Sequence, residues 1–151
     1  MSKKNKKCIF PGTFETFHDG HKNILKRALK VFDFVYVVVA VNPLKKSSDL
    51  KQRYETVKNE ILKLHLQNVE VKMWEGKISD FAEINLTYFI IRGIRDVKDF
   101  QFEKSIERVY KKDCNKLEVI YLISDKDLEN ISSRKLKKTI VNLEEKNKYE
   151  K

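Results

Sequence analysis

Residues 10–21 read Phe-Pro-Gly-Thr-Phe-Glu-Thr-Phe-His-Asp-Gly-His. The short apolar run before the dipeptide Pro11-Gly12 predicts a buried strand over residues 7–10 that ends in a turn. Over residues 20–32, apolar side chains recur at helical spacing, with basic side chains on the other face. In an open α/β sheet, a strand-to-helix turn lies at the carboxyl edge of the strands, where ligands bind. The stretch therefore predicts a turn that holds the phosphates of a nucleotide.

The rest of the chain alternates apolar runs with helical patterns. Strands are predicted over 34–41, 69–73, 87–91 and 117–123, and helices over about 50–66, 78–86, 100–110 and 134–141. The run 34–41 is apolar on both faces, which is typical of a central parallel strand covered by helices. Five strands alternating with helices predict a doubly wound parallel sheet in a single α/β domain, because parallel neighbours need crossover helices. Residues 1–6 and about 142–151 are predicted to be flexible tails.

Composition limits the class of protein. A chain of 151 residues suits one domain. Its net charge of +10, from 32 Lys and Arg against 22 Asp and Glu, is compatible with a nucleic acid, an anionic membrane or a small polyanionic ligand as partner. No run approaches the ~18 apolar residues of a membrane span, and the lysine-rich start lacks a secretory apolar segment. Cys8 and Cys114 are interpreted as reduced, structural thiols of a cytosolic protein.

Basic side chains follow several of the predicted strand ends. They are His18, His21, Lys45, Lys46, Arg92 and Arg95. Such a cluster suits phosphoryl chemistry, in which catalysis is mostly positioning and stabilisation of charge. Glycines stand only at 12, 20, 76 and 93, so neither a Walker A loop nor a G-x-G-x-x-G fingerprint can be written. Ordinary kinases, ATPases and dinucleotide-binding proteins are thereby excluded, and phosphate must be held by side chains and by the helix start near Gly20.

Each of these motifs has a second interpretation. His18 and His21 could donate to two phosphate oxygens at once; alternatively, one caps the helix and the other is a surface residue. Arg92 and Arg95 stand on either side of a predicted turn, and each guanidinium could make two parallel hydrogen bonds to a phosphate. The alternative is a solvated pair of side chains in a loop. A zinc site would need ligands beyond the two histidines, and none stands in a recognisable motif. The aromatic residues are typical of single-stranded nucleic-acid binding, but their positions in strands and on apolar helix faces favour a core role.

Two segments resemble a known family. Pro-Gly-Thr-Phe followed by x-Gly-His resembles the signature of the HxGH nucleotidyltransferases. Residues 92–103, Arg-Gly-Ile-Arg-Asp-Val-Lys-Asp-Phe-Gln-Phe-Glu, resemble the bacterial phosphopantetheine adenylyltransferases in particular. The resemblance spans about residues 7–140 and implies a Rossmann-like sheet, a cytoplasmic location and a homohexamer. It further implies a step of coenzyme A biosynthesis in which 4′-phosphopantetheine attacks the α-phosphorus of ATP directly, with Mg²⁺, giving dephospho-CoA and pyrophosphate.

The resemblance also implies roles for individual residues. His21 would stabilise the transition state, and Lys45 and Arg92 would hold the acceptor phosphate. Thr13 would contact both substrates, and Ile78 would line the pantetheine pocket. The residues that would bind ATP are Thr13, Phe14, His18, His21, Gly93, Ile94, Arg95, Glu103, Leu128, Glu129, Asn130, Ile131, Ser132, Ser133 and Arg134. No side chain is expected to ligate a metal, and neither nucleic acid nor membrane is an expected partner.

Some positions depart from the family pattern and keep two alternatives open. His18 stands where this family usually has Thr and where cytidylyl relatives have His. Tyr110, Leu128 and Arg134 replace an Asn, a Trp and a hydroxyl residue, and Glu15-Thr16 replaces Asp-Pro. One alternative is a sister nucleotidyltransferase that uses CTP or another phosphate acceptor. The other is a non-catalytic basic module that binds nucleic acid.

Overall fold

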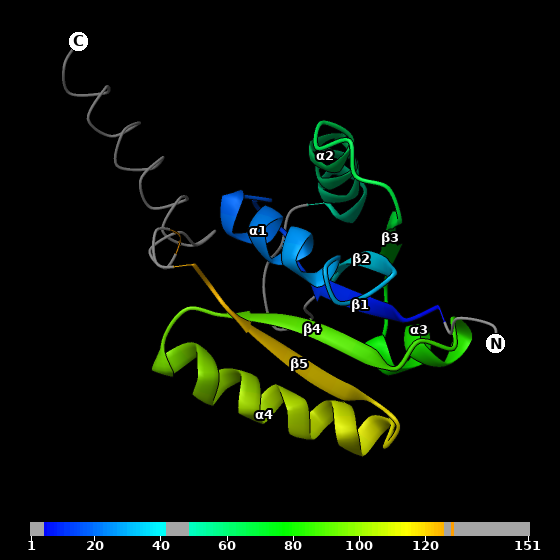
Figure 1. The fold of residues 1–151 in the computed structure, drawn as a ribbon. Helices are drawn as coiled ribbons and strands as arrows, with labels where there is room; N and C mark the ends of the chain where they lie inside the picture. Colours follow the sequence, from blue (N-terminus) through cyan, green and yellow to red (C-terminus); the bar gives the residue numbers. More distant parts are fainter. Residues whose placement is uncertain (1–4, 42–48, 126–127, 129–151) are drawn as a thin grey trace, which may run out of the picture.

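The computed structural model describes residues 5–41, 49–125 and 128 of the chain. Within these residues, five parallel strands form one sheet in the order β3-β2-β1-β4-β5 (Figure 1). The strands are β1 (Lys7–Gly12), β2 (Phe34–Ala40), β3 (Val69–Trp74), β4 (Phe89–Ile94) and β5 (Glu118–Ile123). The chain runs outward from β1 to β3 and then returns to β4 on the other side of β1. The strand order therefore reverses between β1 and β4, the point at which open α/β sheets bind ligands.

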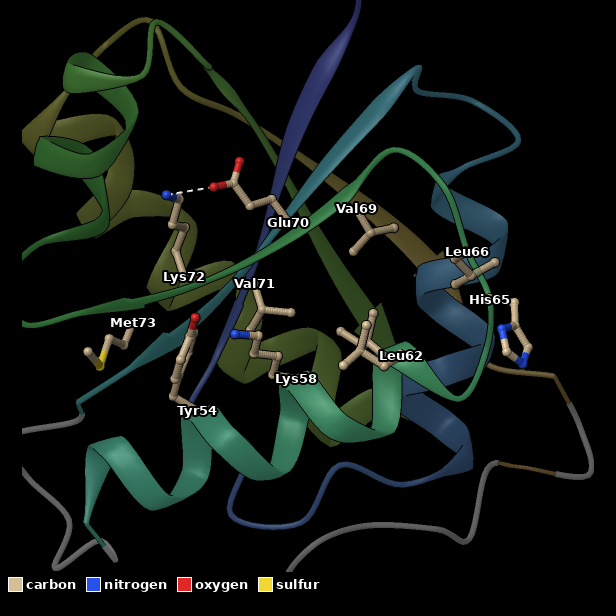
Figure 2. Close-up of a pocket in the computed structure, with 11 residues that line it drawn as sticks. Tyr54, Lys58, Leu62, His65, Leu66, Val69, Glu70, Val71, Lys72 and Met73 are labelled. Carbon is tan, nitrogen blue, oxygen red and sulfur yellow. Dashed lines mark ion pairs between the residues drawn. The ribbon is translucent and has the colours of Figure 1, made fainter.

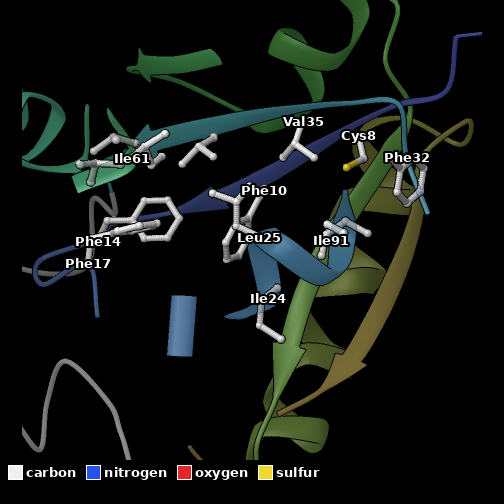
Figure 3. Packing of buried hydrophobic residues seen from close by; sticks show 14 residues of the cluster. Cys8, Phe10, Phe14, Phe17, Ile24, Leu25, Phe32, Val35, Ile61 and Ile91 are labelled. Atoms are coloured by element: carbon white, nitrogen blue, oxygen red, sulfur yellow. The ribbon is translucent and has the colours of Figure 1, made fainter. Parts of the chain in front are cut away.

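Helices in the described part of the chain cover both faces of the sheet. α1 (Asp19–Ala28) and α2 (Leu50–Leu62) lie on one face, and α3 (Ile78–Ile84) and α4 (Val97–Asp113) lie on the other (Figure 1). Phe10 of β1 belongs to the core beneath α1 and α2, with Leu25 and Val57 (Figure 3). Its neighbour Ile9 belongs to the opposite core with Phe81, because successive strand residues face opposite sides. The predicted doubly wound parallel sheet is confirmed.

β1 is longer than predicted and continues through Pro11 and Gly12, which pair with Val38 and Val39 of β2. The Pro11 carbonyl accepts a hydrogen bond from Arg92, so its polar groups face β4. In an extended strand the nitrogen and carbonyl of one residue point to the same side, and the proline nitrogen has no hydrogen to donate. Pro11 therefore removes no hydrogen bond from the ladder with β2, and the strand does not end there.

β4 begins and ends later than the predicted strand 87–91. Its last three residues, 92–94, pair with residues 121–123 of β5. The sequence pattern predicted that Arg92 begins a turn after the strand. In the structure Arg92 is a strand residue. The apolar pattern of the sequence could not predict where β4 ends, because Arg92 is a charged strand residue whose side chain pairs with Glu103 of α4.

Three helices end sooner than predicted, namely α1 at Ala28, α2 at Leu62 and α3 at Ile84. The backbone turns left-handed at His65, with φ 51°, and at Leu86, with φ 49°, and a right-handed helix cannot continue through such residues. Lys6, predicted to lie in a tail, exchanges hydrogen bonds with Asp33. The predicted helix 134–141 and the tail 142–151 lie outside the described residues.

Both cysteines are buried and unpaired, as predicted for structural thiols. Burial raises the pKa of the Cys8 thiol to about 12, which leaves it protonated and unreactive. Among the described helices, none has both the length and the apolar composition needed to cross a bilayer.

A groove lies at one edge of the sheet, between α2 and the edge strand β3 (Figure 2). Its walls include Tyr54 and Lys58 of α2 and Val71 and Met73 of β3. Those predicted site residues that lie in the described ranges do not line it. The groove is therefore separate from the predicted nucleotide site.

Candidate active site

The two histidines of the His-Asp-Gly-His segment build the start of α1. The Nδ1 atom of His18 accepts a hydrogen bond from the Gly20 N–H at 3.1 Å. The His18 N–H donates to Nδ1 of His21 at 3.2 Å, which completes a reciprocal cap of the helix. The two imidazole rings stack with their centroids 3.8 Å apart. His18 is thus the cap that the alternative interpretation predicted, whereas His21 is partly buried and is not a surface residue.

Two glycines of this turn make room for aromatic rings of the chain itself. A Cβ atom on Gly20 would lie 2.8 Å from Cε1 of His18, and one on Gly12 would lie 2.9 Å from Cζ of Phe14. Phe14 has a φ of 47°, which is rare for a bulky residue, and this backbone turns its ring over Gly12. Gly12 and Gly20 therefore permit close packing of these rings.

His21 lies against three buried phenylalanines. Its ring centroid is 6.4 Å from that of Phe10, 5.0 Å from that of Phe14 and 5.4 Å from that of Phe17. All three phenylalanines belong to the core beneath α1 and α2 (Figure 3). The prediction that these aromatic residues belong to the core is confirmed. Phe14, predicted to line the ATP site, is a support beneath the His21 ring.

The surroundings keep the His21 imidazole neutral. Burial, followed by the nearby charges of His18, Arg92 and Arg95, lowers the pKa of His21 to about 3, although a hydrogen bond with the Thr16 backbone acts to raise it. Because Nδ1 accepts the hydrogen bond from His18, the proton of the neutral ring is on Nε2. His21 is therefore a neutral hydrogen-bond donor at physiological pH, a state that its sequence could not reveal.

We expect His21 to make the fold sensitive to acid. An unfolded histidine binds its proton near pH 6.5, whereas the folded pKa of His21 is about 3. Between these values the unfolded state binds more protons, so stability is full above pH 6.5 and falls as the pH drops towards 3. His21→Gln should therefore lose less unfolding free energy between pH 7 and pH 4.5 than the wild type, as measured by urea unfolding. Equal acid sensitivity of the two proteins would contradict the assignment.

Arg92 and Glu103 form a bidentate ion pair between β4 and α4. Nε and Nη2 of Arg92 donate to the two carboxylate oxygens of Glu103 at 2.9 and 2.6 Å. Nη1 donates to the Pro11 carbonyl at 2.9 Å, so one guanidinium bridges β4, α4 and β1. Burial acts to lower the pKa of Arg92, but Glu103 outweighs it and raises that pKa. The pair lies where the strand order reverses, and it keeps the Arg92 guanidinium charged and fixed in place there.

Arg95, which directly follows β4, forms a second pair with Asp99, one helical turn before Glu103 on α4. Nε and Nη2 of Arg95 donate to the Asp99 carboxylate at 2.8 and 2.9 Å. Burial acts to raise the pKa of Asp99, but the hydrogen bonds and charge of Arg95 lower it overall. Asp99 and Glu103 are four residues apart on α4 and so share one helical face, and each one binds an arginine. Glu103, which the resemblance assigns to ATP, is the counter-ion of Arg92 in this structure.

Arg53 of α2 also reaches this edge of the sheet, although no motif marks it. It is 3% exposed, and its Nη1 donates to the carbonyls of Thr13 and Ala40 at 2.5 and 2.8 Å. The sequence did contain a signal for this position. Arg53 precedes the buried residues Val57 and Ile61 by four and eight positions, so it lies on the apolar stripe of the helix. A basic residue within an apolar stripe indicates a buried polar partner.

A second hollow, of about 630 Å³, opens where β2 and β3 end. Its size suits a small-molecule ligand. Ile78 of α3 lines it, together with Val109 and Tyr110 of α4. Tyr110 also lies near the Arg92–Glu103 pair, since both charges act on its hydroxyl. Tyr110 therefore connects the lining of the hollow with the Arg92–Glu103 pair.

Some of the remaining predicted site residues lie within the described ranges, and others lie outside them. Thr13 directly follows β1, and Gly93 lets α1 pack on β4, because a Cβ there would lie 3.1 Å from Cγ1 of Ile24. Ile94 ends β4, and the N–H of Leu128 donates to Asp125. Lys45 and residues 129–134 lie outside the described residues. In the described part of the chain, no three His, Cys, Asp or Glu side chains gather to hold a metal.

A parallel α/β sheet with a neutral histidine at its first helix start and paired arginines at its reversal point defines the nucleotidyltransferase class. The chain matches the cytidylyltransferase-like family model over residues 9–139. It is 62% identical over 151 residues to phosphopantetheine adenylyltransferase of Malacoplasma penetrans, covering 99% of this chain and 98% of that protein. The enzyme of the same name from Mycoplasma mycoides subsp. mycoides is 43% identical over 131 residues, covering 85% and 91%. The chain therefore belongs to the phosphopantetheine adenylyltransferase family.

Solved structures of more distant proteins share the fold. A putative nicotinate-nucleotide adenylyltransferase from Vibrio parahaemolyticus matches with a TM-score of 0.60 and 19% identity, over 86% of this chain and 77% of that one. Nicotinic acid mononucleotide adenylyltransferase from Plasmodium falciparum matches with a TM-score of 0.56 and 16% identity, over 89% and 83%. At these identities the likeness establishes the Rossmann-like fold.

Proposed function

We propose that this protein transfers the adenylyl group of ATP to 4′-phosphopantetheine, giving dephospho-CoA and pyrophosphate in coenzyme A biosynthesis. The observation that carries the proposal is the 62% identity, over 99% of the chain, to a phosphopantetheine adenylyltransferase. The geometry around His21 and Arg92 supports the type of reaction. It supplies a neutral donor and a fixed cation at the edge of the sheet where nucleotides bind.

In the proposed reaction, an oxygen of the acceptor phosphate attacks the α-phosphorus of ATP in line with the leaving pyrophosphate. The new oxygen–phosphorus bond forms as the bond to the bridging oxygen breaks, so no covalent enzyme intermediate is required. Negative charge develops on the α-phosphate oxygens during this step. We assign the Nε2–H of His21 as the hydrogen-bond donor to these oxygens. A neutral donor held in place by a helix cap needs no reorganisation when the charge develops.

We assign the acceptor phosphate to Lys45 and Arg92. A guanidinium has five N–H donors, and the contacts of Arg92 with Glu103 and Pro11 use three of them. The remaining donors suit a phosphate oxygen. The hollow lined by Ile78 and Tyr110 is assigned to the pantetheine arm, because its volume suits a small-molecule ligand and because the charge of Arg92 acts on Tyr110 in its lining. We assign ATP to Thr13, to residues 93–95 and to residues 128–134.

Mg²⁺ is proposed to accompany ATP. The described residues offer no cluster of ligands for the ion, and the acidic side chains nearest the site, Asp99 and Glu103, are bound to arginines. Mg²⁺ commonly keeps several waters and binds substrate phosphates. The phosphate oxygens of ATP and water would therefore be its ligands, and it would offset their negative charge.

His18 does not require CTP as the substrate. The resemblance associates His at this position with cytidylyl relatives and Thr with this family. In the structure His18 accepts the Gly20 N–H through Nδ1, which is the capping role that a threonine hydroxyl performs. The cap therefore accounts for His18 within an ATP-dependent enzyme.

The substrate pair can be tested directly. Pyrophosphate release should be observed with ATP plus 4′-phosphopantetheine, and not with CTP plus glycerol phosphate or with ATP alone, because the acceptor pocket and phosphate site must both be filled. A coupled assay for pyrophosphate measures all three mixtures. Release only with CTP would indicate the sister enzyme, and no release with any mixture would favour the nucleic-acid-binding alternative.

We also propose that the enzyme is a homo-oligomer, a hexamer by resemblance, and that it acts in the cytoplasm. Apolar side chains exposed on α4 support an interface between copies, namely Val97, Phe100, Phe102 and Val109. Light scattering of the purified protein would give the assembly state, and a monomer would contradict this proposal.

A further inference from the structure

We propose that Arg53 is a positioning residue for adenylyl transfer, which holds the Thr13–Phe14 peptide in the orientation that the His21 site requires. The inference rests on the proposed function for its activity readout. Arg53 lies on α2, outside every motif of the family resemblance, and it is 3% exposed.

The guanidinium of Arg53 joins three elements at the carboxyl edge of the sheet. Its Nη1 donates to the Thr13 carbonyl at 2.5 Å and to the Ala40 carbonyl at 2.8 Å. Its Nε is 4.0 Å from an Oε1 atom of Glu15, whose side chain is 15% exposed. Thr13 follows β1, and Ala40 is the last residue of β2. One buried cation therefore fixes the distance between the turn after β1 and the chain that leaves β2.

This contact acts on the His21 site through Phe14. The carbonyl that Arg53 binds belongs to the peptide bond immediately before Phe14, whose φ is 47°. A bulky residue keeps such a backbone only when its surroundings hold it. The Phe14 ring then stands at 88° to the His21 ring, with centroids 5.0 Å apart. Without Arg53, the peptide is free to rotate, and the support of His21 changes.

The same contact fixes where the segment after β2 begins. Ala40 is followed, beyond Val41, by residues 42–48, which include Lys45. The proposed function assigns Thr13 to ATP and Lys45, with Arg92, to the acceptor phosphate. Arg53 therefore holds the end of β2 beside the turn that follows β1, although burying its charge carries a desolvation cost that an apolar residue would avoid.

The test compares Arg53→Lys and Arg53→Met with a control of similar stability loss. Leu117→Ala is suitable, because Leu117 is fully buried in the other core and directly precedes β5, at the opposite edge of the sheet. Arg53→Lys keeps the charge but not the fork, so it should lower kcat/KM about 10–100-fold, as expected when reacting groups are displaced by about 1 Å. Arg53→Met should lose more, and Leu117→Ala should stay within about twofold of the wild type at a temperature where urea unfolding shows all of them folded.

A second readout needs no turnover. The ring signals of His21 in a histidine NMR spectrum report its stacking on Phe14 and His18. They should shift in Arg53→Lys and remain unchanged in Leu117→Ala. Unchanged signals and wild-type kcat/KM in Arg53→Lys would overturn the positioning role, as would an equal activity loss in Leu117→Ala. If the wild type releases no pyrophosphate, the proposed function fails, and the NMR comparison still decides the role of Arg53.

Discussion

Replacement of His21 by alanine should lower kcat about 10²–10³-fold and change ATP affinity little, the size of effect seen when one preorganised transition-state donor is removed. The neutral Nε2–H of His21 is aimed by its cap and its phenylalanine contacts, so its strongest interaction comes when charge develops on the α-phosphate. Pyrophosphate release gives kcat, and calorimetric titration with ATP gives affinity. A loss confined to ATP affinity would show that His21 binds the ground state.

The matched control for His21→Ala is His65→Ala. His65 is the third histidine of the chain and lies exposed just after α2, beside the groove of Figure 2. Its replacement removes the same chemical group far from the site and should leave kcat unchanged. Since His21 also accepts the His18 N–H, its replacement weakens the cap of α1, so urea unfolding of the His21 variant must confirm that it is folded under assay conditions.

The sheet was predictable because its signals are local. Continuous apolar runs such as residues 34–41 identified buried parallel strands, and the helical spacing between them fixed the alternation that makes the sheet doubly wound. Strand ends were less predictable. Pro11 and Arg92 look like breakers in the sequence, yet both lie within strands, because the proline nitrogen faces away from β2 and the arginine is neutralised by Glu103.

The site was predictable only as a set of residue types. The His-x-Gly-His spacing identified His21, but its neutral state depends on burial and on charges from β4 that no spacing reveals. The i, i+4 spacing placed Asp99 and Glu103 on one face of α4, but which arginine each would bind depends on how α4 packs on the sheet. Arg53 illustrates the limit most clearly, since its partners are backbone carbonyls, which leave no trace in side-chain patterns.

The Arg92–Glu103 and Arg95–Asp99 pairs join the same kinds of charge but differ in burial. Breaking each pair therefore tests how burial changes its contribution to the free energy of unfolding. The side chains of the first pair are 23% and 7% exposed, and those of the second are 30% and 23% exposed. Glu103→Ala leaves Arg92 without a counter-ion in the less exposed location, so it should lower the free energy of unfolding by about 3 kcal/mol, the lower end of the range for broken buried pairs. Asp99→Ala, one turn earlier, should cost only about 1 kcal/mol, as more exposed pairs do.

Urea unfolding of the two single variants tests this difference, and equal losses would contradict it. A double variant, Arg92→Met with Glu103→Leu, then separates stability from function. Replacing both members of a buried pair by apolar residues is often neutral or stabilising, so the double variant should be more stable than Glu103→Ala. It should nevertheless lack adenylyl transfer, because it lacks the cation assigned to the acceptor phosphate. Recovered stability without activity would mean that the pair holds Arg92 in place for phosphate and that the fold itself does not require it.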